Sequence, residues 1–353
     1  MSDISISDCT ILIYTYNRPE FLRRSLEYWK DCDVKILVAD GSDEPYSIIP
    51  ENTKYIHCPG KTIVERIRIL VNKVDTNFAV FVADDDFIGF EALERSVEFL
   101  KRNNDYSSVQ GLYTRFWTLK SVNKVISEPN DYNYSKNYNW NSDCYANRLV
   151  DVNKHKVMHY CYSVVTRSTL STLINLFEKI DKNLGNTFFE PLMAYAAAIE
   201  GKIKIQKYFY CARQVQVQDW RGIVLFENLI KNNDPEYVAL LNNVVSICKN
   251  KYQEDDNKAY QIALDAGQAY LDAIEIKEKS IANNQQSNNK IFQFYSKYKN
   301  IIKIYFQMLG IMKNHGVDID FFDGDGIALQ SYNRDWARIN KVLLEVKVSK
   351  IKY

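Results

Sequence analysis

Short apolar runs alternate with helical segments along the first ninety residues, and few folds accommodate such an alternation. Residues 11–16, 34–39 and 78–83 have the length and composition of buried strands, and residues 54–57 form a shorter strand between the last two. Strands that alternate with helices build parallel sheets covered by helices on both faces. We therefore predict an α/β fold with a mostly parallel sheet.

Two of the intervening helices carry recognisable start signals. Pro19 follows the turn residues Asn17 and Arg18 and suits the first helical position, where its missing N–H has no partner to lose. Thr62 and Glu65 have the spacing of a capping box, in which each side chain binds the backbone N–H of the other residue. These signals predict a helix after the first strand and another after the third.

Three of the predicted strands end in polar residues. Asn17 comes after the first strand, Asp40 after the second, and Asp84, Asp85 and Asp86 after the fourth. In open α/β sheets, ligands bind at the carboxyl ends of the strands. We therefore expect these side chains to belong to a single binding site.

The acidic triplet has the chemistry of a metal site. Asp84 and Asp86 are separated by one residue, so both carboxylates are able to project toward the same point. Mg²⁺ and similar hard cations take oxygen ligands, and phosphates of the substrate complete their coordination. We predict Mn²⁺ or Mg²⁺ at Asp86 and Asp84. The alternative is a solvated acidic turn without a ligand, which the preceding apolar strand disfavours.

Three segments, TILIYTYNRPEFLRRSL, ILVADGSDE and FVADDD, occur in this order and spacing. Together they resemble the nucleotide-sugar-binding half of glycosyltransferases of the GT-A fold, close to glycosyltransferase family 2, over about residues 8–220. The resemblance implies a nucleotide-sugar donor, with Asp84 near the ribose and Asp86 on the metal. Arg66 is expected at the diphosphate or the base, or else as a solvated helical arginine. The residues assigned to the nucleotide are Thr15, Tyr16, Asn17, Arg18, Asp40, Arg66, Asp84 and Asp85.

A general base is also implied, because the family places an acid at the start of a helix beyond the metal motif. Glu190 precedes Pro191, which suits a first helical turn, so we expect Glu190 to take the acceptor proton in an inverting transfer. The alternative is a helix-terminal glutamate favoured by the helix dipole. Glu200 and Asp181 are weaker choices for the base.

The acceptor side is assigned to His159, Trp220 and Arg221. Family members that extend polysaccharides carry Gln-x-x-Arg-Trp, whereas here Trp220 precedes Arg221, which argues against processive synthesis. Trp220 suits stacking on a sugar, or it closes the core. His155 and His159 have the spacing of two ligands on one helical face, although such pairs are more often incidental.

Length and local composition suggest two regions. We predict a catalytic domain over residues 1–222 and an α-helical region over 223–353, with 105–150 as an irregular loop or lid. Residues 290–313 read as a basic amphipathic helix, which suits an anionic membrane surface. The preferred alternative is a helix that packs on the catalytic domain or on a second copy of the chain.

Charge and cysteine usage narrow the partners and the compartment. The 45 Lys and Arg residues balance the 44 Asp and Glu residues, so no global positive field attracts nucleic acid. The seven cysteines include no CxxC pair, which argues against a zinc site or a disulfide scaffold. The first residues lack both a basic and an apolar stretch, so we expect no signal peptide. We expect a cytoplasmic protein, with peripheral contact to the inner face of the membrane as an option.

These observations predict a metal-dependent, inverting glycosyltransferase of the hexosyl-transferring type. Its donor would be a nucleotide-diphosphate sugar and its acceptor a glycan or lipid-linked hydroxyl, in bacterial-type surface glycan assembly. One alternative is a nucleotidyltransferase, although such enzymes carry a glycine-rich loop after the first strand, and Tyr16 to Pro19 contains no glycine. Another alternative is a non-catalytic sugar-binding protein on the same scaffold.

Overall fold

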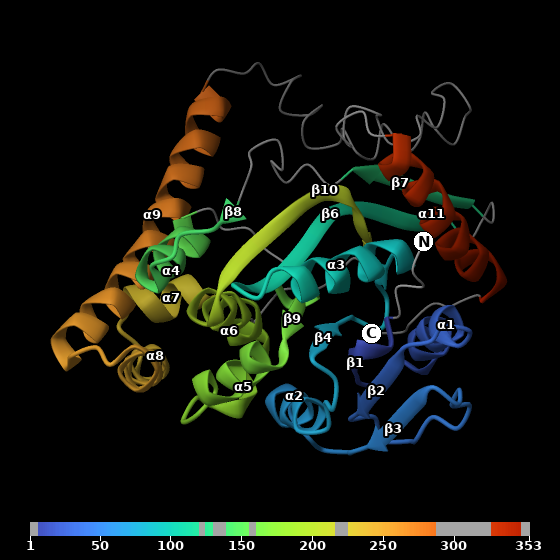
Figure 1. Cartoon of the computed structure of the whole chain (residues 1–353), viewed down its shortest axis with the longest axis horizontal. Helices are drawn as coiled ribbons and strands as arrows, with labels where there is room; N and C mark the ends of the chain where they lie inside the picture. Colours follow the sequence, from blue (N-terminus) through green and yellow to red (C-terminus); the bar gives the residue numbers. More distant parts are fainter. Residues whose placement is uncertain are drawn as a thin grey trace.

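The computed structural model describes residues 6–119, 124–129, 139–154, 160–215, 225–286 and 326–346, and the following account concerns these (Figure 1). A large sheet forms the centre of the molecule. Its strands are β1 (Cys9–Thr15), β2 (Lys35–Asp40), β3 (Thr53–His57), β4 (Phe78–Phe81), β5 (Phe87–Ile88), β6 (Tyr106–Leu119), β7 (Lys124–Pro129), β8 (Asn139–Trp140), β9 (Val164–Thr166) and β10 (Lys202–Gln214).

The sheet has the order β3-β2-β1-β4-β9-β6-β10-β5, with β7 beside β6 and β8 beside β10. The neighbours β3, β2, β1 and β4 are parallel, and so are β6 and β10. The short strand β9 runs antiparallel to both β4 and β6 and joins the two parallel groups. The structure therefore confirms the predicted α/β fold, although the sheet is mixed.

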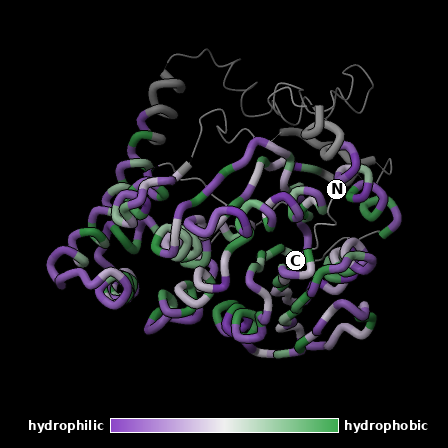
Figure 2. The backbone as a smooth tube through the Cα atoms, viewed as in Figure 1, coloured by the Kyte–Doolittle hydropathy of each residue, from purple (hydrophilic) through white to green (hydrophobic). Residues whose placement is uncertain are grey.

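Helices cover the sheet on both faces. In Figure 2 most of them alternate between hydrophilic and hydrophobic along their length, as expected for helices that bury one face. The helices are α1 (Pro19–Trp29), α2 (Ile63–Val71), α3 (Phe90–Arg102), α4 (Tyr145–Lys154), α5 (Arg167–Leu176), α6 (Gly185–Glu200), α7 (Phe226–Lys231), α8 (Pro235–Tyr252), α9 (Asp256–Gln286) and α11 (Gly326–Glu345).

Both predicted helix starts are confirmed. Pro19 is the first residue of α1, and the side chains of Thr62 and Glu65 form the capping box that opens α2. The capping box supplies hydrogen-bond partners for two N–H groups at the N-terminus of α2, where the helix itself offers none. This end of α2 faces the carboxyl end of β1, so the box also fixes one wall of the site described below.

The prediction of an irregular loop over residues 105–150 was wrong. This segment contains the long strand β6, the strand β7 and the helix α4. Its polar residues suggested a loop, but several of them lie inside the sheet, where Gln110 and Tyr113 bind each other. Gln110 is fully buried, and its Oε1 accepts hydrogen bonds from Tyr113 and Ser163. Polar groups paired in this way are compatible with a buried strand.

The C-terminal helices pack on the sheet-bearing part of the chain. The rings of Tyr145 on α4 and Tyr252 on α8 stack with centroids 3.9 Å apart. On the other side, Trp336 of α11 lies against Phe116 of β6 and Phe209 of β10. Within the described ranges, no helix is both long enough and apolar enough to cross a membrane. The predicted amphipathic helix at 290–313 lies outside these ranges.

Asp335 of α11 is one of the residues that connect this helix to α3, beside Arg334, which binds Glu91. It is fully buried, and its Oδ1 accepts a hydrogen bond of 2.9 Å from the backbone N–H of Phe90, at the start of α3. Its Oδ2 has no hydrogen-bond partner among the described residues. Burial raises the pKa of Asp335 to about 6, because the charged form loses its hydration. The folded protein therefore favours the protonated carboxyl group more than the unfolded chain does.

We expect Asp335→Asn to gain stability relative to wild type as the pH rises from 4 to 8. A folded pKa above the unfolded one stabilises the fold at low pH, and this contribution disappears as the pH passes through about 6. Asparagine keeps the acceptor oxygen but does not ionise. Urea unfolding at pH 4 and at pH 8 gives the free energy of unfolding of the variant and of the wild type. The variant's value minus the wild-type value should increase by up to roughly 3 kcal/mol between the two pH values. A difference that is independent of pH would contradict the assignment.

Candidate active site

A cavity of about 670 Å³ opens where β1, β4 and β10 end. It brings together residues that are far apart in the sequence, from the first strand to the last strand of the sheet. Among the residues predicted from the sequence, those that line it are Thr15, Tyr16, Arg18, Arg66, Asp84, Asp85, Asp86 and Glu190. Its other lining residues are Tyr14, Ile63, Ala83, Arg115, Cys161, Tyr162, Asn186, Phe189, Arg213, Gln214 and Val215.

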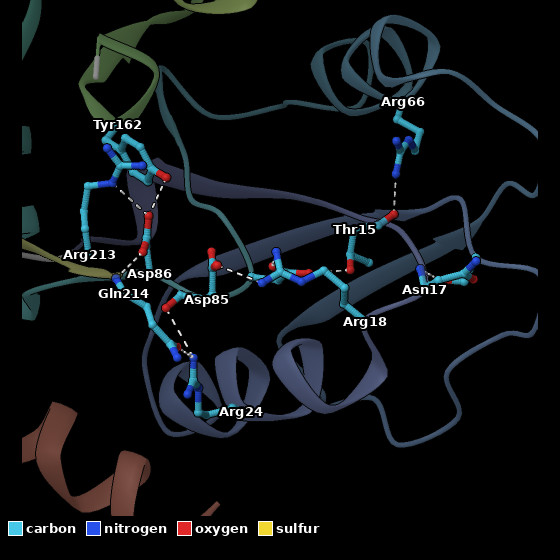
Figure 3. Close-up of polar contacts among 12 residues, drawn as sticks. Thr15, Asn17, Arg18, Arg24, Arg66, Asp85, Asp86, Tyr162, Arg213 and Gln214 are labelled. Atoms are coloured by element: carbon cyan, nitrogen blue, oxygen red, sulfur yellow. Dashed lines mark hydrogen bonds and ion pairs between the residues drawn. The ribbon is translucent and has the colours of Figure 1, made fainter. Parts of the chain in front are cut away.

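The first two acids of the triplet are held from the β1–α1 turn. Arg18 places Nη1 at 2.7 Å from Asp84 Oδ1. Its Nη2 lies 2.7 Å from Asp85 Oδ2 (Figure 3). Thr15, the last residue of β1, donates its hydroxyl to Asp84 Oδ2 at 2.6 Å. The turn after the first strand thus fixes the acids that follow β4, because parallel neighbours end at the same edge of the sheet.

Asp86 is held from the opposite side of the cavity. Its Oδ2 accepts hydrogen bonds from the hydroxyl of Tyr162, at 2.5 Å, and from Nε of Arg213, at 3.2 Å (Figure 3). Its Oδ1 accepts one from the backbone N–H of Gln214 at 2.7 Å. Asp84 and Asp86 therefore point into the same cavity but are anchored by different elements.

Burial sets the electrostatics of these acids. Asp84 and Asp86 are each 2% exposed, and desolvation raises the pKa of both carboxyl groups. Arg18 opposes this rise at Asp84, and Arg213 opposes it at Asp86. The two arginines therefore help to keep buried carboxylates charged, and a charged form is what a metal ligand requires.

A buried arginine behind the cavity joins the two halves of this arrangement. Arg24 of α1 is 1% exposed and donates through Nη2 to the backbone oxygen of Asp85 at 3.3 Å and to Gln214 Oε1 at 2.5 Å. Its guanidinium group also lies over the rings of Phe21 and Phe87, 5.0 and 5.3 Å from their centroids. Burial lowers the pKa of Arg24 to about 10, although Asp85 favours its charge.

We expect Arg24→Met to lower the free energy of unfolding by roughly 3 kcal/mol, because it leaves buried polar partners without their charged donor. Methionine retains much of the volume, so the loss reports on the polar contacts to Asp85 and Gln214. Urea unfolding measures the change, with Arg23→Met at an exposed position of the same helix as the control. Equal stability of the two variants would remove the structural role proposed for Arg24.

Two of the predicted nucleotide residues do not line the cavity. Asp40 is 2% exposed; its Oδ1 accepts from Ser42, and its Oδ2 accepts from the hydroxyl of Tyr55 at 2.7 Å. Asn17 adopts a φ of 51° and donates its backbone N–H to Ser42 Oγ at 2.7 Å. Both residues thus support the loop beside Tyr16 through one shared serine.

Arg66 lies at the wall of the cavity rather than in solvent. It is 9% exposed, and its Nη1 donates to the backbone oxygen of Thr15. Its guanidinium carbon lies 5.7 Å from the ring centroid of Tyr16, whose side chain is 53% exposed. The alternative of a solvated helical arginine is therefore wrong. The accessible ring of Tyr16 and the donors of Arg66 form a polar and aromatic corner of the site.

Glu190 lies on α6, but not at its start as predicted. The helix begins at Gly185, so Glu190 falls in its second turn and Pro191 lies inside the helix. Glu190 lines the cavity, where its Oε1 accepts a weak hydrogen bond from Cys161 Sγ at 3.6 Å. The weaker choices lie elsewhere. Glu200 binds Thr172 and Lys251, and Asp181 caps a short 3₁₀ helix, so neither lines the cavity.

Some site residues were missed from the sequence, and others fall where the structure gives no description. Arg213 and Gln214 were missed because these polar residues follow the apolar run that ends at Cys211, whereas β10 continues to Gln214. His155, His159, Trp220 and Arg221 lie outside the described residues, so their predicted roles stay predictions.

The described residues contain no cluster of three or more His, Cys, Asp or Glu side chains suited to hold a metal. Two carboxylates nevertheless fit a divalent cation whose remaining ligands come from phosphate and water. Asp86 Oδ1 and both carboxylate oxygens of Asp84 each accept one contact, and a carboxylate oxygen has capacity for about two. Hard oxygen donors at the wall of an open cavity suit Mn²⁺ or Mg²⁺.

The fold and the cavity define an α/β protein with an acidic cavity at the carboxyl ends of its strands. A family model described as glycosyl transferase family 2 matches residues 10–174, which include β1, the acidic triplet and Cys161. Residues 10–174 of this chain are therefore similar to glycosyltransferase family 2, and the resemblance seen in the sequence is confirmed.

Solved structures of S. aureus TarS are also similar. The TarS chain is 12% identical, with a TM-score of 0.46, over 75% of this chain and 43% of that chain. TarS 1–349 is 12% identical, with a TM-score of 0.45, over 75% of this chain and 72% of that chain. The complex of TarS 1–349 with UDP-GlcNAc is 11% identical, with a TM-score of 0.47, over 72% of this chain and 70% of that chain. This chain thus spans less than half of the TarS chain. No curated protein matches the sequence.

Proposed function

We propose that this protein transfers a sugar from a nucleoside diphosphate sugar to a hydroxyl acceptor. The main observation behind the proposal is that the acids after β4 and Glu190 of α6 line the same cavity. An acidic site for a diphosphate and a separate carboxylate for a proton are the two groups that such a transfer needs. The similarity of residues 10–174 to family 2 supports the same reaction class.

The nucleoside is proposed to bind beside β1. Tyr16 offers an exposed ring for stacking, and Arg66, held next to it, offers hydrogen-bond donors to a base or a phosphate. Asp84 lies at the end of the adjacent strand, where it suits a ribose hydroxyl. Asp40 and Asn17 contribute indirectly, because they fix the loop next to Tyr16 through Ser42.

The diphosphate is proposed to lie at Asp86 with Mn²⁺ or Mg²⁺, and Asp84 is the second carboxylate available to the ion. When bound, such an ion supplies positive charge that stabilises the departing diphosphate. Arg213 and Tyr162 orient the Asp86 carboxylate by binding its Oδ2. Burial favours the protonated form of Asp86, and the neighbouring Arg213 opposes this effect. Arg213 therefore helps to keep the carboxylate charged for a cation.

Glu190 is proposed as the general base. The acceptor oxygen forms a bond to the anomeric carbon, the bond from that carbon to the diphosphate breaks, and Glu190 takes the hydroxyl proton. Attack from the face opposite the diphosphate inverts the configuration. Glu190 and Asp86 line the same cavity but come from α6 and from the turn after β4, so one acid serves the acceptor and the other the donor.

The acceptor is proposed to be a glycan or a lipid-linked glycan of a surface polysaccharide or glycolipid. All seven cysteines are free, which suits a protein that works in a reducing compartment such as the cytoplasm. Residues after 222 are proposed to make contacts to this acceptor, to a membrane surface or to a second copy of the chain.

A ligand screen followed by product analysis tests the function. UDP, GDP, ADP and CDP are added with and without Mn²⁺, and at least one is expected to raise the melting temperature, because a ligand that binds only the folded state stabilises it. Incubation with the matching nucleotide sugars should then release the nucleoside diphosphate. Release of pyrophosphate would indicate a nucleotidyltransferase, and nucleotide binding without turnover at any acceptor would indicate a binding protein.

A further inference from the structure

Tyr14 is the one residue of β1 whose side chain is not fully buried. Its ring packs edge-on against the ring of Phe189 on α6, with centroids 5.7 Å apart, and lies 6.3 Å from the ring of Phe81 on β4. The side chain lines the cavity, yet among the described residues its hydroxyl group has no hydrogen-bond partner. Tyrosine hydroxyls removed from bulk solvent usually have one. The ring is therefore held in place while its polar end remains available to a ligand.

The hydroxyl of Tyr14 lies near both acids that the proposed reaction uses. Phe189, on which the ring packs, directly precedes Glu190 in α6. Thr15, the next residue of β1, binds Asp84. Burial raises the pKa of Tyr14, and the negative charges of Glu190 and Asp84 raise it further. The hydroxyl therefore stays protonated and able to donate a hydrogen bond.

Asn186 presents a second available polar group to the same cavity. It lies one turn before Glu190 on α6, so the two side chains share a face of the helix, and both line the cavity. The side chain of Asn186 is exposed, and its amide has no hydrogen-bond partner among the described residues. Gly185, the residue before it, packs so closely on Ile63 of α2 that a side chain would not fit there. This packing fixes the start of α6, and with it the position of Asn186.

The proposed reaction determines where the transferred sugar lies. Its anomeric carbon is bonded to the diphosphate, which is proposed to lie at Asp86, and is attacked by the acceptor oxygen, whose proton goes to Glu190. The sugar ring must therefore fill the part of the cavity between the acidic triplet and α6. Tyr14 is near both of these groups, and Asn186 comes from α6 itself.

We propose that the Tyr14 hydroxyl and the Asn186 amide bind hydroxyl groups of the donor sugar and thereby select which sugar is transferred. Sugar hydroxyls both donate and accept, so they match a phenol and an amide. A site built to bind a substrate hydroxyl rejects an analogue without it, because its own polar groups are then left unpaired. This inference rests on the proposed function and adds the residues that would recognise the sugar.

The first experiment compares binding of a nucleoside diphosphate with binding of its sugar conjugates, by titration calorimetry with Mn²⁺ and without acceptor. The probes are the diphosphate among UDP, GDP, ADP and CDP that binds the wild type most tightly, and its glucose, galactose, mannose and N-acetylglucosamine conjugates. We expect Tyr14→Phe to weaken binding of the preferred conjugate about tenfold, the effect of losing one hydrogen bond, and to leave the free diphosphate unchanged. Asn186→Ala should show the same pattern and provides a second test if Tyr14→Phe unfolds, which circular dichroism would show.

Each variant has a matched control. Tyr106, at the start of β6, also packs its ring on a phenylalanine, Phe99, at 4.9 Å between centroids, but it does not line the cavity. Tyr106→Phe should therefore bind both probes as the wild type does. Asn175→Ala, at an exposed position of α5, is the control for Asn186→Ala and should also bind both probes normally.

The second experiment separates direct contact from an indirect structural effect. Analogues of the preferred conjugate that each lack one sugar hydroxyl are titrated into the wild type and into Tyr14→Phe. If Tyr14 binds one of these hydroxyls, the wild type loses about tenfold in affinity for the analogue that lacks it, and Tyr14→Phe loses nothing further. An indirect effect would instead lower the affinity of Tyr14→Phe for every analogue by the same factor, which would overturn the assignment.

Two further results would also overturn it. One is wild-type affinity for the preferred conjugate in both Tyr14→Phe and Asn186→Ala. The other is unchanged donor binding with an increased KM for the acceptor, which would assign the two residues to the acceptor. In both cases the nucleoside diphosphate still binds and the proposed function stands. If the wild type bound no nucleotide at all, the proposed function would fail and the inference with it.

Discussion

Replacing Asp86 by asparagine is expected to lower kcat/KM for sugar transfer about a thousandfold. The side chain keeps its size, but it loses the charge that would hold a divalent cation against the departing diphosphate, and that stabilisation is worth several kcal/mol. The amide must also place an NH₂ or a neutral oxygen toward Tyr162 and Arg213, both of which donate to Asp86 Oδ2 in the wild type. Release of nucleoside diphosphate from the donor sugar measures the effect.

The same variant should lose the dependence of nucleotide binding on metal. In the wild type, Mn²⁺ is expected to strengthen binding of the nucleoside diphosphate, and in Asp86→Asn the affinities with and without Mn²⁺ should be nearly equal. Asp33→Asn, which alters an exposed carboxylate near the end of α1, is the control and should behave as wild type. Unchanged turnover in a folded Asp86→Asn protein would remove the metal assignment and the role of the triplet with it.

The position of polar residues directly after a predicted strand was the most informative sequence feature for this site. Applied to β4, it found the acidic triplet, which lines the cavity, but applied to β1 it found Asn17, which does not. Thr15 and Arg18, which do line the cavity, came from the resemblance to the family. Applied to β10 it failed, because the apolar run stops at Cys211 while the backbone pairing with β6 continues to Gln214. Where a strand extends past the core, polar residues such as Arg213 give no periodic hydrophobic signal. The length of β10 therefore depends on its backbone pairing with β6, which the sequence does not reveal.

Position at a strand end also did not decide where a side chain points. Asp40 follows a strand as Asp86 does, yet its carboxylate is bound by Tyr55 of β3 and by Ser42, and it does not line the cavity. The donor comes from the neighbouring strand, and only the three-dimensional register brings it there. The predicted loop at 105–150 failed for a related reason, since Gln110 is buried through partners such as Ser163, which lies far along the chain.

Replacing Glu190 by glutamine is expected to lower kcat about 10²- to 10⁴-fold while leaving nucleotide binding unchanged. Loss of a positioned general base has an effect of this size, and the donor contacts proposed at Arg66, Asp84 and Asp86 do not involve Glu190. Glutamine preserves an acceptor oxygen for Cys161, so the local packing is retained. Steady-state kinetics at saturating donor, together with calorimetric titration of the nucleoside diphosphate, separate the loss of the base from the loss of the donor site.

Glu200→Gln provides the matched control, because Glu200 lies on the same helix but binds Thr172 and Lys251 away from the cavity. It should turn over at close to the wild-type rate. Addition of azide to Glu190→Gln gives a further readout: if the acceptor hydroxyl needs a base, a nucleophile that carries no proton should bypass that need and partly restore release of the nucleoside diphosphate. Wild-type kcat in Glu190→Gln, or equal losses in both variants, would show that another group removes the proton.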